Sequence, residues 1–288
     1  MPRLGANGIF IEYESFGAER DEVVLLINGL GAQMTRWPEP FCQGLSAEGL
    51  RVVRFDNRDV GLSTWLEAGA RYSLADMAQD AVGLMDGLRI HRAHIVGLSM
   101  GGMIGQTLAA THPNRALSLT SIMSSTGNPD LPRPTAEAIA ATQRSDLRPE
   151  DGEPFVAAGV KATRAIEGPG FPWAEAQIRR RVTEEAARAF NPEGVGRQRK
   201  AVVTAGDRRE QLRTISAPTV VLHGAEDPLA RVECGRDTAA VIPGAELLVV
   251  PGMGHSLPPQ LHEVFKAAIL RAVARGRHAL SLEAMSAR

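Results

Sequence analysis

The feature that most constrains this chain is a pentapeptide, Gly97-Leu98-Ser99-Met100-Gly101. It directly follows the apolar run 93–96 and lies just before residues 103–112, which have the composition of a helix. A serine held between a strand and a helix by two glycines lies on a strained turn, with its hydroxyl exposed and the next backbone N–H free. The pattern predicts a nucleophile at Ser99, although glycine and serine are also common in ordinary turns.

A histidine that can serve as the base for this serine lies near the carboxyl end of the chain. His255 occurs in Pro251-Gly252-Met253-Gly254-His255-Ser256, a loop-forming sequence that presents a ring rather than burying it. A serine hydroxyl is a weak nucleophile at neutral pH, so a neighbouring histidine must accept its proton. A second histidine, His223, lies at the end of the apolar run 219–222. It can either line the site or bond only to the backbone.

The predicted acid is Asp227, which follows the same apolar run 219–222. Glu226 is its adjacent rival, but Pro228 restricts residue 227 to an extended conformation that can direct its carboxylate back over the sheet edge. Some enzymes of this layout take the acid from the end of the preceding strand. Here that strand-like segment, 117–123, has no carboxylate after it until Asp130, so Asp227 is favoured. The resulting order along the chain is serine, aspartate, histidine, as in α/β-hydrolases and unlike chymotrypsin or subtilisin.

Two backbone N–H groups are placed to form an oxyanion hole. One belongs to Met100, directly after the predicted nucleophile, and the other to Leu30 in the segment Ile27-Asn28-Gly29-Leu30-Gly31. The segment resembles oxyanion loops that often carry a histidine at the position of Asn28. We expect its side-chain amide to tether this loop and preserve the hole.

Strand-like and helix-like segments alternate along the chain. The strand-like segments are 9–13, 23–27, 52–55, 93–96, 117–123, 219–222 and 246–250, and the helix-like ones include 37–47, 74–88 and 103–112. Short continuous apolar strands separated by amphipathic helices predict a mostly parallel sheet covered on both faces. The predicted fold class is therefore α/β, with the α/β-hydrolase architecture.

The alternation stops in the middle of the chain. A turn-rich stretch at 127–134 is followed by a helix-prone segment, broken by prolines, that contains no convincing strand until Ala217-Pro218. We predict a core domain made of residues 1–127 and 214–288, with residues 128–213 inserted as a helical cap. Such an insertion is placed to cover the carboxyl edge of the sheet, where open α/β sheets bind ligands.

Apolar side chains are expected to line the site beneath this cap. The candidates for substrate binding are Trp37, Phe171, Trp173 and Leu229. The run Phe171-Pro172-Trp173 is the most apolar short segment of the insertion, and the alternative is that it packs the cap onto the core. The expectation is a mostly apolar pocket for a small molecule.

Composition narrows the choice of partners and compartment. The chain has 288 residues, of which 23% are charged, and a formal net charge of −1, so it has no basic field that favours nucleic acid. No segment resembles a membrane span or a signal peptide, which predicts a cytoplasmic protein.

Cys42 and Cys234 are expected to be free buried thiols. No metal-binding spacing or cofactor motif occurs, and the oligomeric state is left open.

These motifs together resemble the α/β-hydrolase superfamily over the whole chain. The segment Asp56-Asn57-Arg58-Asp59-Val60-Gly61-Leu62-Ser63 resembles a loop of that superfamily, but with Asp59 where most members have glycine. Together with the segments 97–101 and 251–255, this departure resembles the family of aclacinomycin methylesterase and related carboxylesterases. The resemblance implies hydrolysis of carboxylic esters without a cofactor. We interpret Asp56, Arg58 and Asp59 as structural residues that pin a turn through bonds to the backbone.

Several reactions use this scaffold, so the fold alone does not determine the function. A serine at position 99 argues against haloalkane dehalogenases and epoxide hydrolases, whose nucleophile is a carboxylate. Ester hydrolysis through an acyl-enzyme is the favoured reaction, because the expected lining of the site is apolar. The lining offers no carboxylate to bind the free amino terminus that the substrate of an aminopeptidase carries. The alternatives are a lactonase, thioesterase, peptidase, carbon–carbon hydrolase or perhydrolase on the same residues, or a non-catalytic ligand-binding member of the fold.

Overall fold

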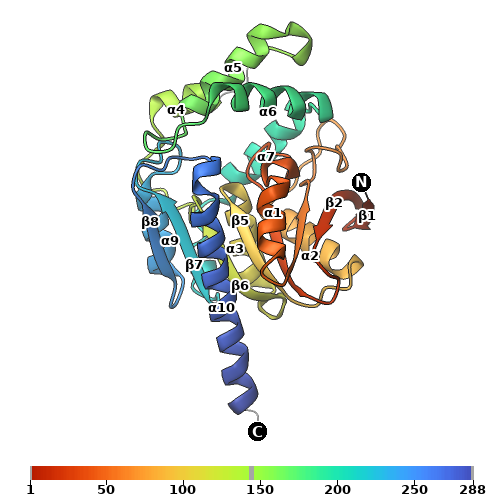
Figure 1. Cartoon of the computed structure of the whole chain (residues 1–288), viewed down its shortest axis with the longest axis vertical. Helices are drawn as coiled ribbons and strands as arrows, with labels where there is room; N and C mark the ends of the chain where they lie inside the picture. The colour runs from red at the N-terminus through yellow and green to blue at the C-terminus, as the bar shows by residue number, and fades with distance from the viewer. Residues whose placement is uncertain (1, 143–145, 287–288) are drawn as a thin grey trace.

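The computed structural model describes residues 2–142 and 146–286, and a twisted sheet lies at its centre (Figure 1). The described residues contribute eight strands in the order β1-β2-β4-β3-β5-β6-β7-β8. The strands are β1 Arg3–Ala6, β2 Ile9–Phe16, β3 Glu22–Ile27, β4 Leu50–Phe55, β5 Ala93–Leu98, β6 Ala116–Ile122, β7 Thr219–Gly224 and β8 Glu246–Val250. Strands β1 and β2 pair antiparallel, as do β2 and β4, whereas the pairs from β4 through β8 are parallel.

Helices cover both faces of the sheet and form the inserted segment. Those of the core are α1 Glu39–Ser46, α2 Leu74–Gly87, α3 Met100–Thr111, α9 Val232–Val241 and α10 His262–Ser286. Those between β6 and β7 are α4 Ala136–Thr142, α5 Glu153–Arg164, α6 Glu175–Arg188, α7 Pro192–Ala205 and α8 Arg209–Leu212. Short 3-10 turns lie at Met34–Arg36, Pro113–Arg115, Pro149–Asp151 and Pro259–Leu261.

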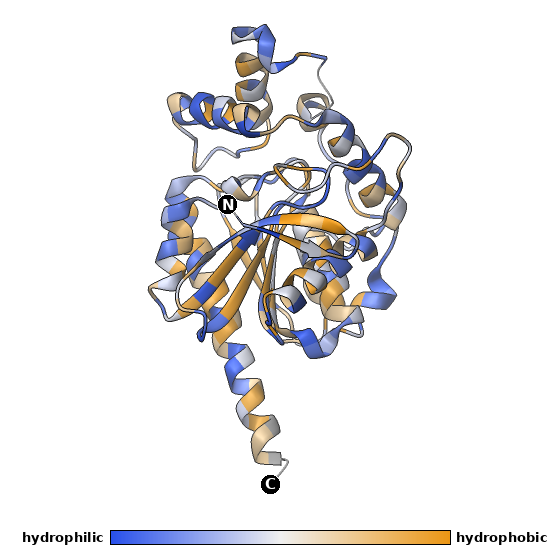
Figure 2. Cartoon of the chain, turned by 90° about the vertical axis from the view of Figure 1, so that its right-hand side faces the viewer, coloured by the Kyte–Doolittle hydropathy of each residue, from blue (hydrophilic) through white to orange (hydrophobic). Residues whose placement is uncertain are grey.

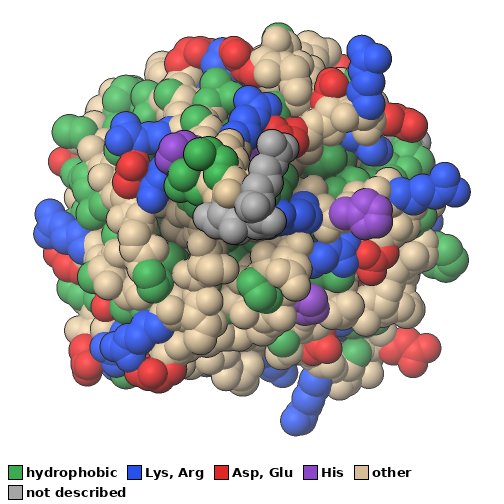
Figure 3. Space-filling view, turned by 90° about the horizontal axis from the view of Figure 1, so that it is seen from below, with side chains coloured by type: hydrophobic (Ala, Val, Ile, Leu, Met, Phe, Trp, Pro, Cys, Tyr) green, Lys and Arg blue, Asp and Glu red, His purple; other side chains and the backbone are tan. Residues whose placement is uncertain are grey.

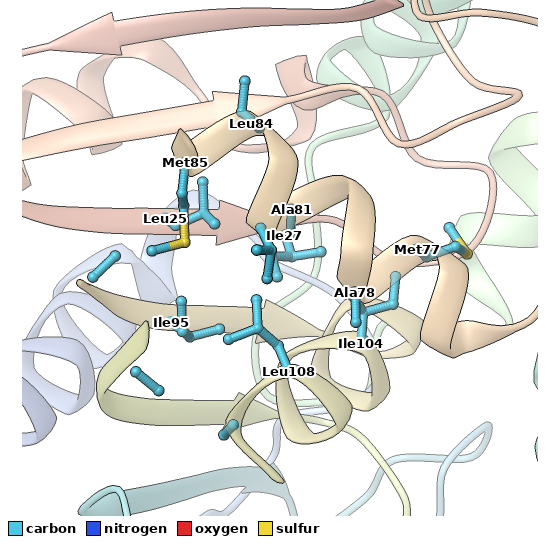
Figure 4. Close-up of a cluster of buried hydrophobic side chains, with 14 of the residues drawn as sticks. Leu25, Ile27, Met77, Ala78, Ala81, Leu84, Met85, Ile95, Ile104 and Leu108 are labelled. Carbon is cyan, nitrogen blue, oxygen red and sulfur yellow. The ribbon is translucent and has the colours of Figure 1, made fainter. Parts of the chain in front are cut away.

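The sheet separates two hydrophobic clusters because neighbouring side chains of a strand point to opposite faces. In β3, Leu25 and Ile27 pack with α2 and α3, as the close-up in Figure 4 shows. Val24 and Leu26 pack on the other face with α1 and α10. Burial on both faces explains why these strands read as continuous apolar runs, and Figure 2 shows the hydrophobic strands between more mixed helices.

The architecture confirms the predicted α/β class and mostly parallel sheet. Two details differ from the expectation. Strand β1, Arg3–Ala6, was not predicted, because Arg3-Leu4-Gly5-Ala6 has little β propensity and gains its place by pairing with β2. Helix α3 begins at Met100, directly after the predicted nucleophile and three residues earlier than its composition indicated.

Figures 1 and 2 show how the inserted segment lies relative to the sheet. Helices α4 to α7 lie together above one end of the sheet, and the last turns of α10 extend away from the opposite end. On the face seen in Figure 3, acidic and basic side chains are interspersed. No helix among the described residues is both long and apolar enough to cross a membrane.

Candidate active site

Ser99 lies in the turn between β5 and α3, in a backbone conformation that residues other than glycine rarely adopt. Its φ is +56° and its ψ is −118°, and such a conformation persists only where its surroundings hold it. The Ser99 N–H donates to the carbonyl of Ile122 over 2.9 Å. The Ser99 carbonyl accepts from the Ser124 hydroxyl over 2.8 Å. Bonds to the neighbouring strand and to the loop after it therefore hold the strained turn.

The two glycines of the pentapeptide are required by close packing. A Cβ atom at Gly97 would lie 2.1 Å from the carbonyl oxygen of Gly101, and one at Gly101 would lie 2.2 Å from that of Ile27. Real Cβ atoms do not approach other atoms so closely, so larger residues would force the turn apart. The Ser99 hydroxyl makes no capping bond to α3 within the described residues, which leaves it available to another side chain.

That side chain is His255, in the loop after β8. Its Nε2 lies 2.9 Å from the Ser99 Oγ, and its Nδ1 lies 2.7 Å from the Asp227 Oδ2. An ionised carboxylate can only accept, so Nδ1–H donates to Asp227 and the Nε2 of the neutral ring accepts from Ser99. The structure brings the three predicted residues together in one hydrogen-bonded chain.

Asp227 is held by its own loop as well as by the histidine. Its side chain is fully buried, and its Oδ1 accepts from the N–H groups of Leu229 over 2.9 Å and Ala230 over 2.8 Å. The neighbouring Glu226 is exposed and accepts instead from the N–H of Gly252. Of the two adjacent carboxylates, the structure places only Asp227 against His255.

His223 lies beside Asp227 and bonds to the backbone, which is the second of the two roles predicted for it. Its Nε2 is 2.7 Å from the Ala230 carbonyl and 3.7 Å from the Asp227 carboxylate. Burial lowers the pKa of His223, and the Ala230 bond and the Asp227 charge only partly oppose this. The ring therefore stays neutral at neutral pH and donates to the Ala230 carbonyl, which anchors the Asp227 loop.

The two predicted oxyanion donors lie next to Ser99. A Cβ at Gly29, the residue before Leu30, would lie 3.2 Å from the Ser99 Cβ, and Met100 is the first residue of α3. Neither Leu30 nor Met100 donates its N–H to an acceptor within residues 2–142 and 146–286. Both donors are thus available to a substrate oxygen.

The expected tether through Asn28 is wrong. Its side-chain nitrogen is buried and has no hydrogen-bond partner in the described part of the chain. The loop is held through its backbone instead, because Asn57 donates to the Asn28 carbonyl over 3.1 Å. In addition, the Gly31 N–H donates to the side chain of Gln198 in α7 over 2.8 Å. No local sequence pattern indicated this second contact.

The four residues predicted to bind substrate occupy different environments. Trp37 is fully buried and stacks on Phe41 in the cluster beneath α1 and α10, so it offers no surface to a substrate in this structure. Phe171 is half-buried and packs against that cluster. Trp173 is half-buried, with the Arg181 guanidinium 4.8 Å from its ring centre. Leu229 is half-buried directly beside Asp227.

The inserted segment is bonded directly to the loop that carries His255. The N–H of His255 donates to the Ile166 carbonyl over 2.5 Å, and that of Gly254 donates to the Glu167 carbonyl over 3.1 Å. The N–H of Gly170 donates to the Gly252 carbonyl over 2.8 Å. We call this contact between residues 166–170 and 252–255 the glycine seam. No motif predicted this contact, although Gly168 and Gly170 flanking Pro169 were a possible signal.

Ion pairs join the insertion to the loop after β4. Arg188 of α6 lies 2.7 Å from Asp56, and Arg197 of α7 makes a bidentate pair with Asp59 at 2.7 and 2.8 Å. Burial raises the pKa of Asp59, but hydrogen bonds from Arg197 and from the N–H of Leu66 outweigh it and lower the value. Asp59 has a φ of +70°, which is the conformation that favours glycine.

The interpretation of Asp56, Arg58 and Asp59 as structural residues was incomplete. Asp56 does bond to backbone N–H groups, at Met34 and Leu62. Arg58 makes a bidentate pair with Asp80. The carboxylates of Asp56 and Asp59 also reach across to the insertion, as described above. Within the described residues, no group of three or more histidine, cysteine or acidic side chains is arranged to hold a metal ion.

Comparison with known proteins identifies the family. The sequence model of the α/β-hydrolase fold matches residues 22–259, which is most of the chain. The chain belongs to the α/β-hydrolase family. It is 30% identical over 274 residues to rhodomycin D methylesterase DnrP from Streptomyces peucetius, covering 89% of this chain and 92% of that protein.

Two lactonases are also similar to this α/β-hydrolase. 3-Oxoadipate enol-lactonase 2 from Acinetobacter baylyi is 29% identical over 233 residues, covering 81% of this chain and 82% of that one. The crystal structure of the enol-lactonase from Burkholderia xenovorans LB400 superposes with a TM-score of 0.74 at 26% identity. That match covers 95% of this chain and the whole of the other.

Proposed function

We propose that this chain is a serine hydrolase that cleaves carboxylic esters of small molecules through an acyl-enzyme on Ser99. The hydrogen-bonded chain from the Ser99 Oγ through His255 to Asp227 carries the proposal. The available N–H groups of Leu30 and Met100 support it. The similarity to a methylesterase supports an ester as the substrate.

In the first half of the reaction, the Ser99 Oγ attacks the ester carbonyl carbon while His255 Nε2 accepts the serine proton. The negative charge that develops on the carbonyl oxygen is stabilised by the N–H groups of Leu30 and Met100. The bond to the alcohol oxygen then breaks, and His255 returns the proton to that oxygen. The alcohol leaves, and the acyl group stays on Ser99 as an ester.

In the second half, a water molecule attacks the acyl carbon and gives its proton to His255. Collapse of the second tetrahedral intermediate breaks the bond to Ser99, which regains the proton as the carboxylic acid leaves. Asp227 stays ionised throughout, fixes the tautomer of His255 and stabilises the imidazolium. Neither step requires a cofactor or a metal ion.

The substrate class follows from the residues proposed to face Ser99. Leu229 lies beside Asp227, and Phe171 and Trp173 belong to the insertion, which we propose acts as a cap made of residues 128–213. We propose that these three side chains form a mostly apolar pocket, in which a longer acyl chain contributes binding free energy until the pocket is filled. Trp37 has no part in this pocket, because it is buried in the core. The cytoplasmic location and the absence of a nucleic-acid partner remain predictions.

Lactone hydrolysis is the second candidate. Two comparisons favour it, since enol-lactonases match this chain in both sequence and structure. A lactone is an internal ester, so Ser99, His255 and Asp227 perform the same steps, and the leaving oxygen stays attached to the acyl group. The choice between a lactone and an open ester depends on the shape of the pocket and not on the reacting residues.

The test is a substrate panel with a serine-directed probe. Purified protein is assayed with methyl, ethyl and p-nitrophenyl esters and with lactones of matched size, and it is labelled separately with a fluorophosphonate. We expect ester turnover and a mass increase at Ser99, both lost in Ser99→Ala. The residual rate of that variant should be at least about 10⁴-fold lower, because it lacks the attacking oxygen.

Three results would change the assignment. Lactones cleaved at least tenfold faster than the matched open esters would make lactone hydrolysis the function. A folded wild-type protein that neither turns over any ester nor becomes labelled would contradict the proposal and favour a non-catalytic ligand-binding member of the family. Wild-type-like turnover by Ser99→Ala would exclude Ser99 as the nucleophile.

A further inference from the structure

Gln198 of α7 makes a fully buried connection between the insertion and the core. Its Oε1 accepts from the Gly31 N–H over 2.8 Å, and its Nε2 donates to the Arg58 carbonyl over 2.8 Å. Because Gly31 offers a donor and Arg58 an acceptor, the orientation of the side-chain amide is determined by its partners. A buried amide satisfied at both ends in this way is rigid.

Gly31 belongs to the turn that carries the Leu30 donor. The N–H of Ala32 donates to the Gly29 carbonyl over 3.2 Å and closes the turn. The φ of Gly31 is +68°, and glycine also populates negative φ freely, so the peptide between Leu30 and Gly31 can turn over. The Asn28 side chain does not restrain the turn, because its nitrogen has no partner among the described residues.

Gln198 holds the peptide between Leu30 and Gly31. Its Oε1 binds the N–H of that peptide, and Val195, one helical turn earlier in α7, lies against Gly31. The turn itself lies against Ser99, since a Cβ at Gly29 would be 3.2 Å from the Ser99 Cβ. A contact from the insertion therefore restrains the backbone beside the proposed nucleophile.

We propose that Gln198 is a positioning residue for the oxyanion hole. It holds the turn of residues 29–32 so that the Leu30 N–H faces the oxygen that becomes negatively charged when Ser99 attacks. The inference rests on the proposed function and adds to it a residue of the insertion that touches neither the substrate nor the reacting atoms. Helix α7 thus takes over the tethering role expected of Asn28.

The test compares two neighbouring substitutions in α7. Gln198→Met keeps the side-chain length but removes both polar contacts, so the Gly31 N–H loses its acceptor. Arg197→Met removes the ion pair with Asp59, which also docks α7 onto the core but does not reach the turn. Both variants should have a lowered melting temperature. Only Gln198→Met should also affect the transition state.

For Gln198→Met we expect kcat to fall roughly 10- to 100-fold, somewhat less than the loss of a whole oxyanion donor. KM for the same ester should change far less, because the oxyanion forms only during the reaction. Inhibition by an alkyl boronic acid, which mimics the tetrahedral intermediate on Ser99, should weaken by the same factor as kcat. Hydrogen exchange at the Gly31 amide should become faster.

Gln198→Glu is the conservative variant that separates positioning from packing. Its carboxyl group keeps an acceptor for Gly31, and in its protonated form it also donates to the Arg58 carbonyl. We expect its kcat to lie within several-fold of the wild-type value. Recovery of kcat and of boronic acid affinity in this variant would support positioning.

Three outcomes would overturn the inference. One is a Gln198→Met variant whose kcat and boronic acid affinity lie within twofold of wild type at a temperature where it is folded. Another is a fall in kcat of Arg197→Met as large as that of Gln198→Met, which would assign the effect to general docking of α7. The third is a wild-type protein without ester turnover, which would overturn the proposed function as well, whereas the first two leave it intact.

Discussion

The turn that carries Ser99 and the loop that carries His255 differ in the parts of the chain that hold them. Bonds to β6 and the loop that follows it hold Ser99: its N–H donates to Ile122 of β6, and its carbonyl accepts from Ser124. The His255 loop is bonded to the core, where the Glu226 N–H donates to the Met253 carbonyl, and also to the inserted segment, because the histidine N–H donates to the Ile166 carbonyl. A short sequence motif can therefore specify the nucleophile, whereas the position of the base depends on a segment from the middle of the chain.

The two regions also use glycine differently. Gly97 and Gly101 are close to each other in sequence and let one strand, one turn and one helix pack together. In the glycine seam, Gly168 and Gly254 come from distant parts of the chain, and a Cβ at Gly168 would lie 2.3 Å from the Gly254 nitrogen. The first arrangement is readable as a motif. The second becomes visible only when the two segments meet.

The largest effect that tests this comparison is expected at Asp227. Asp227→Asn should leave the Ser99 turn intact but favour the wrong tautomer of His255, because an amide N–H can face the ring. By analogy with serine proteases, kcat should fall roughly 10³- to 10⁴-fold. Steady-state kinetics on a single ester measure the change, and an unchanged melting temperature would show that the fold persists.

Glu226→Gln is the matched control for this prediction. Glu226 is adjacent, exposed and bonded to the Gly252 N–H rather than to His255. Its substitution should lower kcat by no more than a few-fold. If Glu226→Gln were the more damaging of the two changes, Glu226 would be the acid and the proposed assignment would be wrong.

A smaller effect concerns His94, in the strand that leads to Ser99. His94 is buried, with its Nδ1 2.8 Å from the Ser118 hydroxyl. Burial lowers its pKa from 6.5 to about 4, although the Glu22 carboxylate opposes this. In the unfolded chain His94 therefore becomes protonated below about pH 6.5, whereas in the folded protein it stays neutral down to about pH 4. Stability should fall as the pH falls through that window, by about 2 kcal/mol at pH ~5.

His94→Asn removes this titration while keeping a polar atom near Ser118. Urea unfolding near neutral pH and at pH ~5 should show a larger loss of stability in wild type than in the variant, since the contributions of all other groups cancel in the difference. Equal losses in the two proteins would contradict the assignment of a neutral buried His94. The experiment would then show that the strand beneath Ser99 has no acid-sensitive point of this kind.

Much of the fold and the site could be predicted because the signals are local. The apolar runs marked the buried strands, and the glycines around Ser99 marked the turn between β5 and α3. His255 and Asp227 were indicated by loop chemistry after two such runs, and the structure brings both to Ser99. Each of these residues lies within a few positions of the feature that revealed it.

The remaining features depend on contacts between distant segments. Trp37 was expected at the site because it is large and apolar, but the same property buries it against Phe41 in the core. Asn28 was expected to tether its loop, but Gln198 does so from a helix whose sequence offers no motif. Asp59 was predicted to pin a turn, and its pairing with Arg197 required knowing where α7 lies.

The central claim is that the insertion completes the site by positioning the base. Gly168→Ala tests it with Gly206→Ala as its control. Both glycines lie in the insertion at positive φ, +79° and +59°, so alanine is strained at each position. An added Cβ at Gly168 would meet the Gly254 nitrogen, whereas at Gly206 no atom of the described residues lies within 4 Å.

The decisive measurement is the second-order rate constant for labelling of Ser99 by a fluorophosphonate in the two variants, each checked for a folded state. Because a base misplaced by about 1 Å costs roughly 10²-fold, we predict that Gly168→Ala is labelled about 100-fold more slowly than wild type. Gly206→Ala should be labelled at the wild-type rate. Equal labelling rates in Gly168→Ala, Gly206→Ala and wild type would contradict the claim that the inserted segment positions His255.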